Sequence, residues 1–165
     1  MIIKSITLNN YRLYKGENTL SLSSSDEKNI VLISGENGFG KTTFLHSLIW
    51  CLYGKLMIEV EVEIRKDINS NGYNSFLRSN MNNDVISEFE RVINDEMRQS
   101  IKKKCYTPEI EHLRTLTTYS VTIEFSEVVI PSLPCTSIKI SRSYDIIQDK
   151  ESVEILIDGV RNELA

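Results

Sequence analysis

The sequence has little of what would mark a secreted, membrane-bound or metal-clustered protein. It has three cysteines, and Cys51, Cys105 and Cys135 are too far apart for a metal-binding spacing or a disulfide framework. No apolar run approaches membrane-spanning length. No charged-then-apolar signal segment opens the chain. We therefore expect a cytoplasmic protein with no membrane partner.

Positive charge is also scarce. The chain has 19 basic and 23 acidic residues, for a net charge of −4. This balance is not the electrostatic footprint of a general nucleic-acid binder, although it is compatible with a local basic patch. A length of 165 residues with 41% hydrophobic and 25% charged residues fits one globular domain with a core of its own.

One glycine-rich stretch carries a specific chemical pattern. An apolar run at residues 30–33 leads into Gly35-Glu36-Asn37-Gly38-Phe39-Gly40-Lys41-Thr42-Thr43. This stretch contains the complete G-x-x-x-x-G-K-T pattern, and it stands where the pattern requires it, between an apolar run and a helix-like segment. The stretch therefore predicts a phosphate-binding loop.

Each part of this loop has a chemical task. The glycines at 35, 38 and 40 allow turns that side chains would block. The N–H groups of residues 37–43 would then converge on a phosphate at the start of the next helix, whose dipole attracts anions. Lys41 would stabilise charge on the outer phosphates and is the candidate catalytic residue. Thr42 would offer its hydroxyl to Mg²⁺. We expect the chain to bind a nucleoside triphosphate.

The segments before the loop alternate like strands. Residues 2–8 and 18–22 predict two short strands that pair as a hairpin, with a turn at residues 9–12. Residues 23–28 are expected to be a polar loop, and residues 29–34 a buried strand. From spacing alone, an arginine in such a turn, Arg12, is simply a surface residue.

A helix is expected over residues 41–53, ended by Gly54. Its apolar face would consist of Phe44, Leu45, Leu48, Ile49 and Leu52. We interpret Trp50 and Tyr53 as packing residues rather than base-stacking ones. His46 falls on the more polar side and is interpreted as a surface residue.

The next segment, residues 55–116, reads as mainly helical. Residues 59–64 fit a strand or a helix equally well, and residues 73–78 predict one or two helical turns. A long amphipathic helix is expected from Asp84, as its cap, to about Lys104, with Pro108 closing the segment. Lysines 102–104 suit the negative end of that helix better than a DNA-binding patch.

The remaining chain alternates apolar and polar residues over 119–126, 138–144 and 153–158, with loop residues at 148–151. These segments predict antiparallel strands with one buried face. Hydrolysis would need four apolar residues ending in Asp, usually followed by Glu. The nearest match ends at Asp158, but Gly159 follows, so we interpret it as a hairpin strand and turn. The loop is thus half of a larger active site or only binds.

Several motifs resemble those of a known family. Residues 2–12, the loop at 35–43 and the ending Leu52-Tyr53-Gly54 resemble the N-terminal head segment of SMC-like repair ATPases. These include the SbcC-type AAA domain and RecF-like proteins, within the ABC ATPase class. Residues 72–78 and the hairpin-like residues 138–159 are most similar to DndD-type ATPases of phosphorothioation-dependent defence and to the SMC-like subunit of Lamassu-type systems.

The resemblance implies an α/β fold: a P-loop NTPase of the ABC ATPase head type, lobe I, with an antiparallel β subdomain and a helical insertion. All of residues 1–165 would form one lobe, divided at 1–54, 55–116 and 117–160. It also implies ATP and Mg²⁺ as ligands, and it makes Arg12 a phosphate or ribose contact. At position 46, relatives commonly carry an acidic or amide residue where this chain has His46, and we expect this difference to have little effect on phosphate binding.

The resemblance further implies partners. In this family two heads enclose two ATP molecules, so a second copy of the head is expected as a homodimer partner. DNA would bind through the full-length assembly, with a nuclease subunit as a further partner, in repair or in anti-phage or anti-plasmid defence. The Walker B element, signature motif and Q-loop would lie downstream, since Gln148 falls in a hairpin loop.

Two other classes of function stay open from the residues alone. One is an interaction module that holds a nucleotide without turnover. The other is a small P-loop kinase or GTPase, although the sequence has no Asn-Lys-x-Asp guanine reader and no arginine-rich lid.

Overall fold

The structure is a computed structural model that describes residues 1–22, 30–103, 107–132 and 134–161. Its centre is one antiparallel sheet of six strands in the order β2-β1-β3-β4-β5-β6. The strands are β1 Ile2–Tyr11, β2 Tyr14–Ser21, β3 Thr118–Ser126, β4 Ile138–Asp145, β5 Lys150–Ile157 and β6 Val160–Arg161. The N-terminal hairpin and the C-terminal strands therefore form a single sheet, joined by the pairing of β1 with β3.

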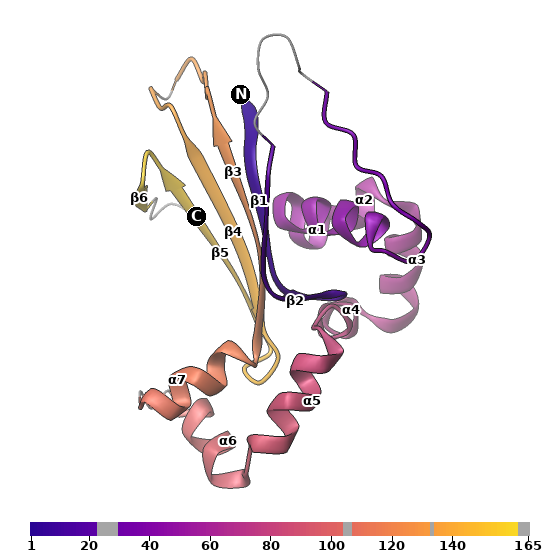
Figure 1. Ribbon diagram of the computed structural model, residues 1–165, viewed down its shortest axis with the longest axis vertical. Coiled ribbons are helices and arrows are strands. Elements are labelled where there is room, and N and C mark those ends of the chain that lie inside the picture. The colour runs from indigo at the N-terminus through magenta and orange to yellow at the C-terminus, as the bar shows by residue number, and fades with distance from the viewer. Residues whose placement is uncertain (23–29, 104–106, 133, 162–165) are drawn as a thin grey trace.

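The helices lie between the loop and β3 in sequence. They are α1 Lys41–Tyr53, α2 Met57–Val60, α3 Val62–Asn71, α4 Tyr73–Ser79, α5 Asn83–Val92, α6 Asp95–Lys102 and α7 Pro108–Thr115, with one 3₁₀ turn at Gly54–Leu56. In Figure 1, α1 to α4 lie to one side of the sheet, and α5 to α7 lie beyond its lower end. No helix in the described part of the chain is long and apolar enough to cross a membrane.

The predicted alternation places one sheet face in the core. Along β3, Tyr119, Val121, Ile123 and Phe125 are buried, and the residues between them are half-buried. Helix α1 packs on this face, over β3 and β4. The opposite face is polar, as where Thr122 and Ser141 share a hydrogen bond of 2.8 Å. The prediction of antiparallel strands with one buried face is confirmed.

Aromatic rings fill the space between α1 and the sheet. Trp50 and Tyr119 are fully buried, with ring centroids 5.1 Å apart, and Tyr11 stacks on Trp50 at 5.9 Å. The interpretation of Trp50 as a packing residue is confirmed. That of Tyr53 is wrong, because this side chain is 47% exposed at the end of α1.

The buried face of α1 also differs from the expected one. Its buried residues are Phe44, Ser47, Trp50 and Cys51, whereas Leu45 and Leu52 are exposed. The helix is turned so that its small and aromatic residues meet the sheet. The helix bounds 41–53 and the end at Gly54 are confirmed.

Residues 30–34 are the main correction. They form no strand in the structure, and Ile30 and Leu32 are 85% and 86% exposed. A strand needs a neighbour to accept its backbone hydrogen bonds, and no described strand pairs with this segment. The expected polar loop at 23–28 lies outside the described residues.

Other boundaries shift for local reasons. The first strand runs on to Tyr11, with Asn10 at φ +53°, and the second strand begins at Tyr14, so the turn is shorter than expected. Residues 59–64 are helical. Strand β5 begins at Lys150 instead of after a loop at 148–151, although Gln148 does lie in the hairpin turn.

The expected long helix from 84 to 104 is two helices, α5 and α6. Asn94 interrupts it, because its extended backbone and its side chain, which accepts from the N–H of Met97, begin a new helix. The cap of α5 is Asn82 rather than Asp84. Pro108 does not close the segment but begins α7, where a proline fits because no N–H is needed.

Candidate nucleotide site

The glycine-rich loop has the backbone geometry that its sequence predicts. Residues 37–40 form a turn that ends at the start of α1. Gly38 and Gly40 have φ values of +90° and +89°, where side chains are rarely tolerated. At Gly40 an added Cβ would also lie 3.1 Å from the Tyr14 hydroxyl oxygen. Gly35 has no positive φ, and an added Cβ there would meet Phe39 Cβ at an ordinary 4.0 Å, so the expectation that a side chain would be blocked does not hold at this glycine.

The start of α1 is open to an anion. Gly40 is its N-cap and makes no side-chain cap, and the first turn contains no acidic residue. The first N–H groups of a helix lack intrahelical partners, and the helix dipole makes this end positive. The backbone N–H groups of Lys41, Thr42 and Thr43 are thus suited to donate hydrogen bonds to a phosphate.

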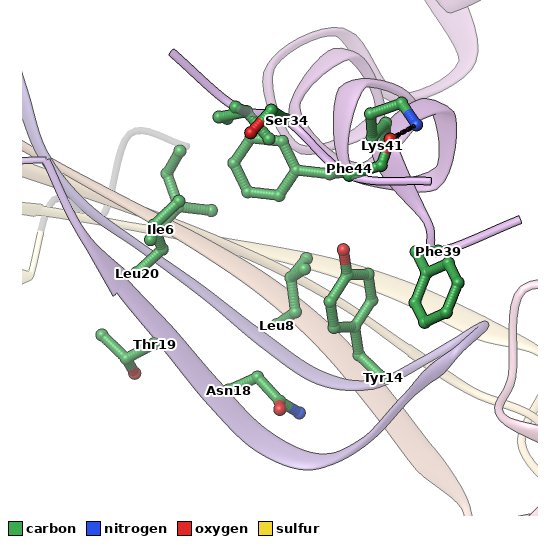
Figure 2. Close-up of a pocket in the computed structure, with 12 residues that line it drawn as sticks. Ile6, Leu8, Tyr14, Asn18, Thr19, Leu20, Ser34, Phe39, Lys41 and Phe44 are labelled. Carbon is green, nitrogen blue, oxygen red and sulfur yellow. Dashed lines mark hydrogen bonds between the residues drawn. The ribbon is translucent and has the colours of Figure 1, made fainter. Parts of the chain in front are cut away.

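Lys41 lies against the loop itself. Its ammonium nitrogen donates to the carbonyl oxygens of Gly35 and Glu36 at 2.5 and 2.8 Å. Lys41 is the first residue of α1, and Figure 2 shows its side chain with one of these hydrogen bonds as a dashed line. Phosphate oxygens are stronger acceptors for an ammonium than neutral carbonyls, so a bound phosphate would compete for these hydrogen bonds.

Two cavities meet at Lys41. The smaller, of about 180 Å³, is lined by Leu13, Asn37, Gly38, Gly40, Lys41, Thr42 and Thr43. This cavity brings together most of the predicted site, and its lining within the described ranges contains no carboxylate. The larger, of about 340 Å³, lies between the loop and the β1–β2 hairpin and is mostly apolar, with Tyr14, Phe39 and Ile33 in its wall (Figure 2).

Arg12 is not among the residues that line the smaller cavity. Its neighbour Leu13 lines that cavity, and its own Nε donates to Asn80 Oδ1 at 2.6 Å. Its guanidinium carbon is 5.8 Å from the centre of the Phe76 ring. The structure therefore holds Arg12 in a defined place against Phe76 of α4 and Asn80 after it, through contacts that sequence spacing did not indicate.

His46 is not the plain surface residue that we expected. It is half-buried, and its Nδ1 is buried without a hydrogen-bond partner in the described part of the chain. Desolvation and then the charge of Arg12 lower the pKa of His46, whereas Glu61 opposes them. The effect of Arg12 on this pKa also puts that guanidinium within electrostatic range of α1.

Asp158 has a structural role, as the sequence interpretation held. Its Oδ1 accepts from the backbone N–H groups of Ser137 and Thr136 at 2.8 and 2.9 Å, and from both hydroxyls. These donors, the Ser137 N–H first, hold the pKa of Asp158 below its usual value. Among the described residues, no group of three or more His, Cys, Asp or Glu side chains could hold a metal ion.

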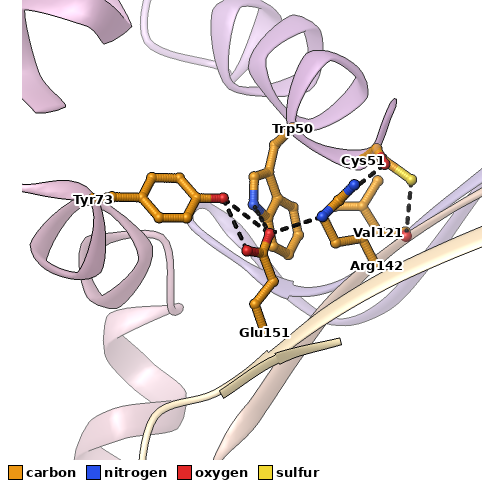
Figure 3. Close-up of polar contacts among 6 residues, drawn as sticks. All are labelled: Trp50, Cys51, Tyr73, Val121, Arg142 and Glu151. Carbon is orange, nitrogen blue, oxygen red and sulfur yellow. Dashed lines mark hydrogen bonds and ion pairs between the residues drawn. The ribbon is translucent and has the colours of Figure 1, made fainter. Parts of the chain in front are cut away.

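The sequence analysis missed a polar network that anchors the end of α1 (Figure 3). Glu151 Oε1 accepts from Trp50 Nε1 at 3.1 Å, from the Tyr73 hydroxyl at 2.9 Å and from Arg142 Nη1 at 3.0 Å. Arg142 Nε also donates to the Cys51 carbonyl at 3.0 Å. Burial, then the charge of Glu151, raises the pKa of Tyr73.

A sequence signal for this network existed. Arg142 and Glu151 stand at positions of β4 and β5 where the alternation calls for inward-facing residues, as Ile140 and Val153 do. A charged residue on a core face is most often paired. The network links α1, α4 and the sheet, and so fixes the helix that carries the loop.

Cys51 behaves as the small core residue that we expected. It is fully buried, and burial raises the pKa of its thiol to about 12. Its Sγ lies 3.3 Å from the carbonyl oxygen of Val121. Cys135 is also buried and free, whereas Cys105 lies outside the described residues.

Comparison with known families agrees with this site. The model of a family described as AAA domain matches residues 5–159, which include the loop, α1 and all of β3 to β5. No curated protein matches the chain. Because the match covers nearly the whole sequence and the loop geometry fits a phosphate, the chain belongs to the AAA domain family of SMC-like ATPases, and its membership implies that it binds a nucleotide, usually with Mg²⁺.

Proposed function

We propose that this chain is the ATP-binding head lobe of an SMC-like, DNA-associated ATPase. The observation that carries the proposal is the loop at residues 35–43. Its positive-φ glycines lead directly into a helix start that has no acidic residue and no side-chain cap. This combination is suited to a polyphosphate rather than to a neutral ligand.

Each residue of the loop has its own role in binding ATP and Mg²⁺. The N–H groups of residues 37–43, which include Asn37, Phe39 and Thr43, surround the phosphates. Lys41 stabilises charge on the β- and γ-phosphates, and Thr42 holds Mg²⁺ through its hydroxyl. Arg12 contacts a phosphate or the ribose from the hairpin side.

Hydrolysis requires a second half of the site. Among the described residues no carboxylate lines the cavity at the loop, so that lining supplies no general base for an attacking water. In addition, the apolar residues 30–33 are exposed, and such a segment becomes a stable strand only when it pairs with another strand. We infer that a further segment of polypeptide pairs with residues 30–33 and supplies the missing acidic groups.

The completed ATPase would work as a dimer. ATP bound at this loop would be enclosed by a second copy of the head, and head dimerisation would be coupled to DNA and to a nuclease subunit. The biological setting that we propose is DNA repair or anti-phage or anti-plasmid defence of the DndD or Lamassu type. This setting rests on the resemblance of residues 72–78 and 138–159.

One observation favours a second candidate function. The lack of a carboxylate among the described residues of the cavity wall also suits an interaction module that holds ATP without turnover. The two candidates differ in whether adding the pairing segment produces hydrolysis.

The test is calorimetry of nucleotide binding with Mg²⁺. We expect ATP binding in the micromolar range and a loss of about tenfold or more in Lys41→Ala, since a hydrogen bond to a charged group contributes about 1.5–3 kcal/mol. Lys55→Ala is the matched control, because this lysine is exposed and outside the loop. Absence of ATP binding by the folded protein would contradict the proposal. Hydrolysis by this chain alone, abolished in Lys41→Ala, would contradict the need for a second half.

A further inference from the structure

We propose that the corner between α4 and α5, residues 80–82, is a positioning element that sets the Arg12 guanidinium beside the nucleotide site. This inference rests on the proposed function, in which Arg12 contacts ATP. The corner belongs to the helical segment between α1 and β3, far from the loop in sequence. On this inference, the helical segment between α1 and β3 takes part in nucleotide binding.

The backbone of the corner pairs with the hairpin turn. The N–H of Arg12 donates to the Asn80 carbonyl at 2.7 Å, and the N–H of Asn82 donates to the Asn10 carbonyl at 2.9 Å. Between them, Tyr11 and Met81 form an antiparallel bridge. The corner thus acts as a short extra strand along the end of β1.

The side chains reinforce this pairing. Asn80 Oδ1 accepts from Arg12 Nε at 2.6 Å, and Asn82 Nδ2 donates to the Arg12 carbonyl at 2.5 Å. Both asparagines are buried, and Asn82 also caps α5. The Phe76 ring lies 5.8 Å from the guanidinium carbon, within the range of a cation–π contact. The corner and the Phe76 ring of α4 therefore hold Arg12 with buried side chains, which have little freedom to move.

Such holding is needed because the turn is strained. Arg12 has φ +48° and Asn10 has φ +53°, a left-handed conformation that a residue with a side chain keeps only when its surroundings enforce it. At Arg12 the contacts that enforce it are those with residues 80–82, whereas the Asn10 side chain is also held by Gly16 and Thr115. Without the corner, we expect the turn to sample other conformations and to carry the guanidinium with it.

The Arg12 guanidinium, although held in place, still has N–H groups that can bind an anion. Only Nε of Arg12 has a hydrogen bond within the described ranges, so both terminal nitrogens are available for an anion. The adjacent Leu13 lines the loop cavity, and the charge of Arg12 is felt at His46 on α1. An arginine that is already oriented loses less freedom when a ligand binds, and so binds more tightly.

The first test compares ATP affinity with Mg²⁺ in Asn80→Ala and in Asn80→Asp. We expect Asn80→Ala to weaken binding about three- to tenfold, since it removes one orienting hydrogen bond. Asn80→Asp keeps an acceptor for Nε and should restore the affinity. Asn74→Ala is the matched control, because Asn74 is an exposed residue of α4 that contacts Asp149 and not the turn.

A double-mutant cycle separates positioning from general loss of structure. In an Arg12→Met background there is no guanidinium to orient, so Asn80→Ala should cause no further loss of affinity. If Asn80→Ala unfolds the chain, Phe76→Leu provides a second variant that removes the ring but keeps an apolar side chain in the core. An unchanged affinity in the folded Asn80 variant, or an equal loss in both backgrounds, overturns the proposal.

A readout without nucleotide distinguishes this inference from the proposed function. The charge of Arg12 lowers the pKa of His46, so release of the guanidinium should raise that pKa in an NMR titration of Asn80→Ala but not in the Arg12→Met background. If the wild-type chain binds no ATP and the His46 pKa still shifts, the proposed function fails and the positioning holds. If the pKa does not move, the positioning fails, whatever the chain binds.

Discussion

Gly54, which ends α1, should be irreplaceable because of what lies against it. Its backbone has φ +53° and ψ −128°, a region that only glycine adopts freely. A Cβ added there would lie 2.5 Å from Arg142 Nη1 and 2.8 Å from its Cζ. Since a Cβ atom makes no hydrogen bond and cannot approach a non-bonded heavy atom so closely, Gly54→Ala must displace the guanidinium.

The magnitude follows from the two parts of this perturbation. The strained backbone costs about 1–3 kcal/mol. The displaced Arg142 loses its hydrogen bonds to the Cys51 carbonyl and to Glu151, both at 3.0 Å, which adds about 1.5–3 kcal/mol for bonds to a charged group. We expect a loss of about 2.5–6 kcal/mol in the free energy of unfolding, a large share of the about 5–15 kcal/mol of a typical domain.

Urea unfolding measures this loss, followed by the fluorescence of Trp50, the one tryptophan of the chain. The matched control is Gly72→Ala. Gly72 also has a glycine-only backbone, with φ +84° and ψ 156°, but a Cβ there meets nothing within 4 Å. It should therefore show the backbone part alone. In an Arg142→Met background, the cost of Gly54→Ala should fall to that same value.

Equal losses for the two glycine variants would refute the reasoning. So would a cost of Gly54→Ala that is unchanged when Arg142 is replaced. Either result would mean that the ending Leu52-Tyr53-Gly54 requires glycine for its backbone alone, and that the guanidinium moves aside freely.

Three further predictions concern stability and assembly. Glu151→Ala should destabilise the chain by about 2–4 kcal/mol in urea unfolding, because it leaves buried donors unpaired, whereas Glu154→Ala, which breaks an exposed ion pair, should cost less than about 1 kcal/mol. Because the pKa of Asp158 is lowered, its carboxylate stabilises the fold at pH values above the ordinary aspartate pKa, and this stabilisation is lost as the pH falls through the lowered pKa. In Asp158→Asn, the urea midpoint should therefore depend less on pH at the acid end. An unchanged dependence of the urea midpoint on pH would contradict this. Leu32→Lys, at an exposed site, should leave the melting temperature unchanged but prevent co-purification with the further polypeptide segment that we propose to pair with residues 30–33. Ile6→Ala, in the core, should instead lower the free energy of unfolding by about 2–5 kcal/mol. A lower melting temperature in Leu32→Lys would show that residues 30–33 are already packed.

Local patterns in the sequence predicted much of the fold. The hairpin, α1 with its end at Gly54, and the alternating strands β3 to β5 all follow from apolar spacing and turn residues. The phosphate-loop geometry could also be predicted from the sequence, because Gly38 and Gly40 adopt the left-handed backbone conformations that glycine permits. The break between α5 and α6 could also have been read, since Asn94 precedes two acidic residues, which is a typical helix start.

Other features depend on contacts between distant residues. Apolar spacing could not tell which side of α1 is buried, because Leu45 and Leu52 fit the same helical stripe as Phe44. It could not give Arg12 its partner, since Asn80 lies 68 positions away. The network around Glu151 likewise joins α1, α4 and the sheet, and only its charged residues at inward-facing positions hint at it.

The sequence by itself determined the phosphate loop, because its glycines, its lysine and the helix that follows act over a few neighbouring residues, where backbone preference decides. The tertiary structure alone decided what surrounds that loop. It placed Arg12 against the corner at 80–82, and it left residues 30–33 exposed, although their apolar run reads as a strand. The physical reason is that a strand, a buried face or an oriented arginine exists only through a partner, and the partner's place is set by the packing of the whole chain.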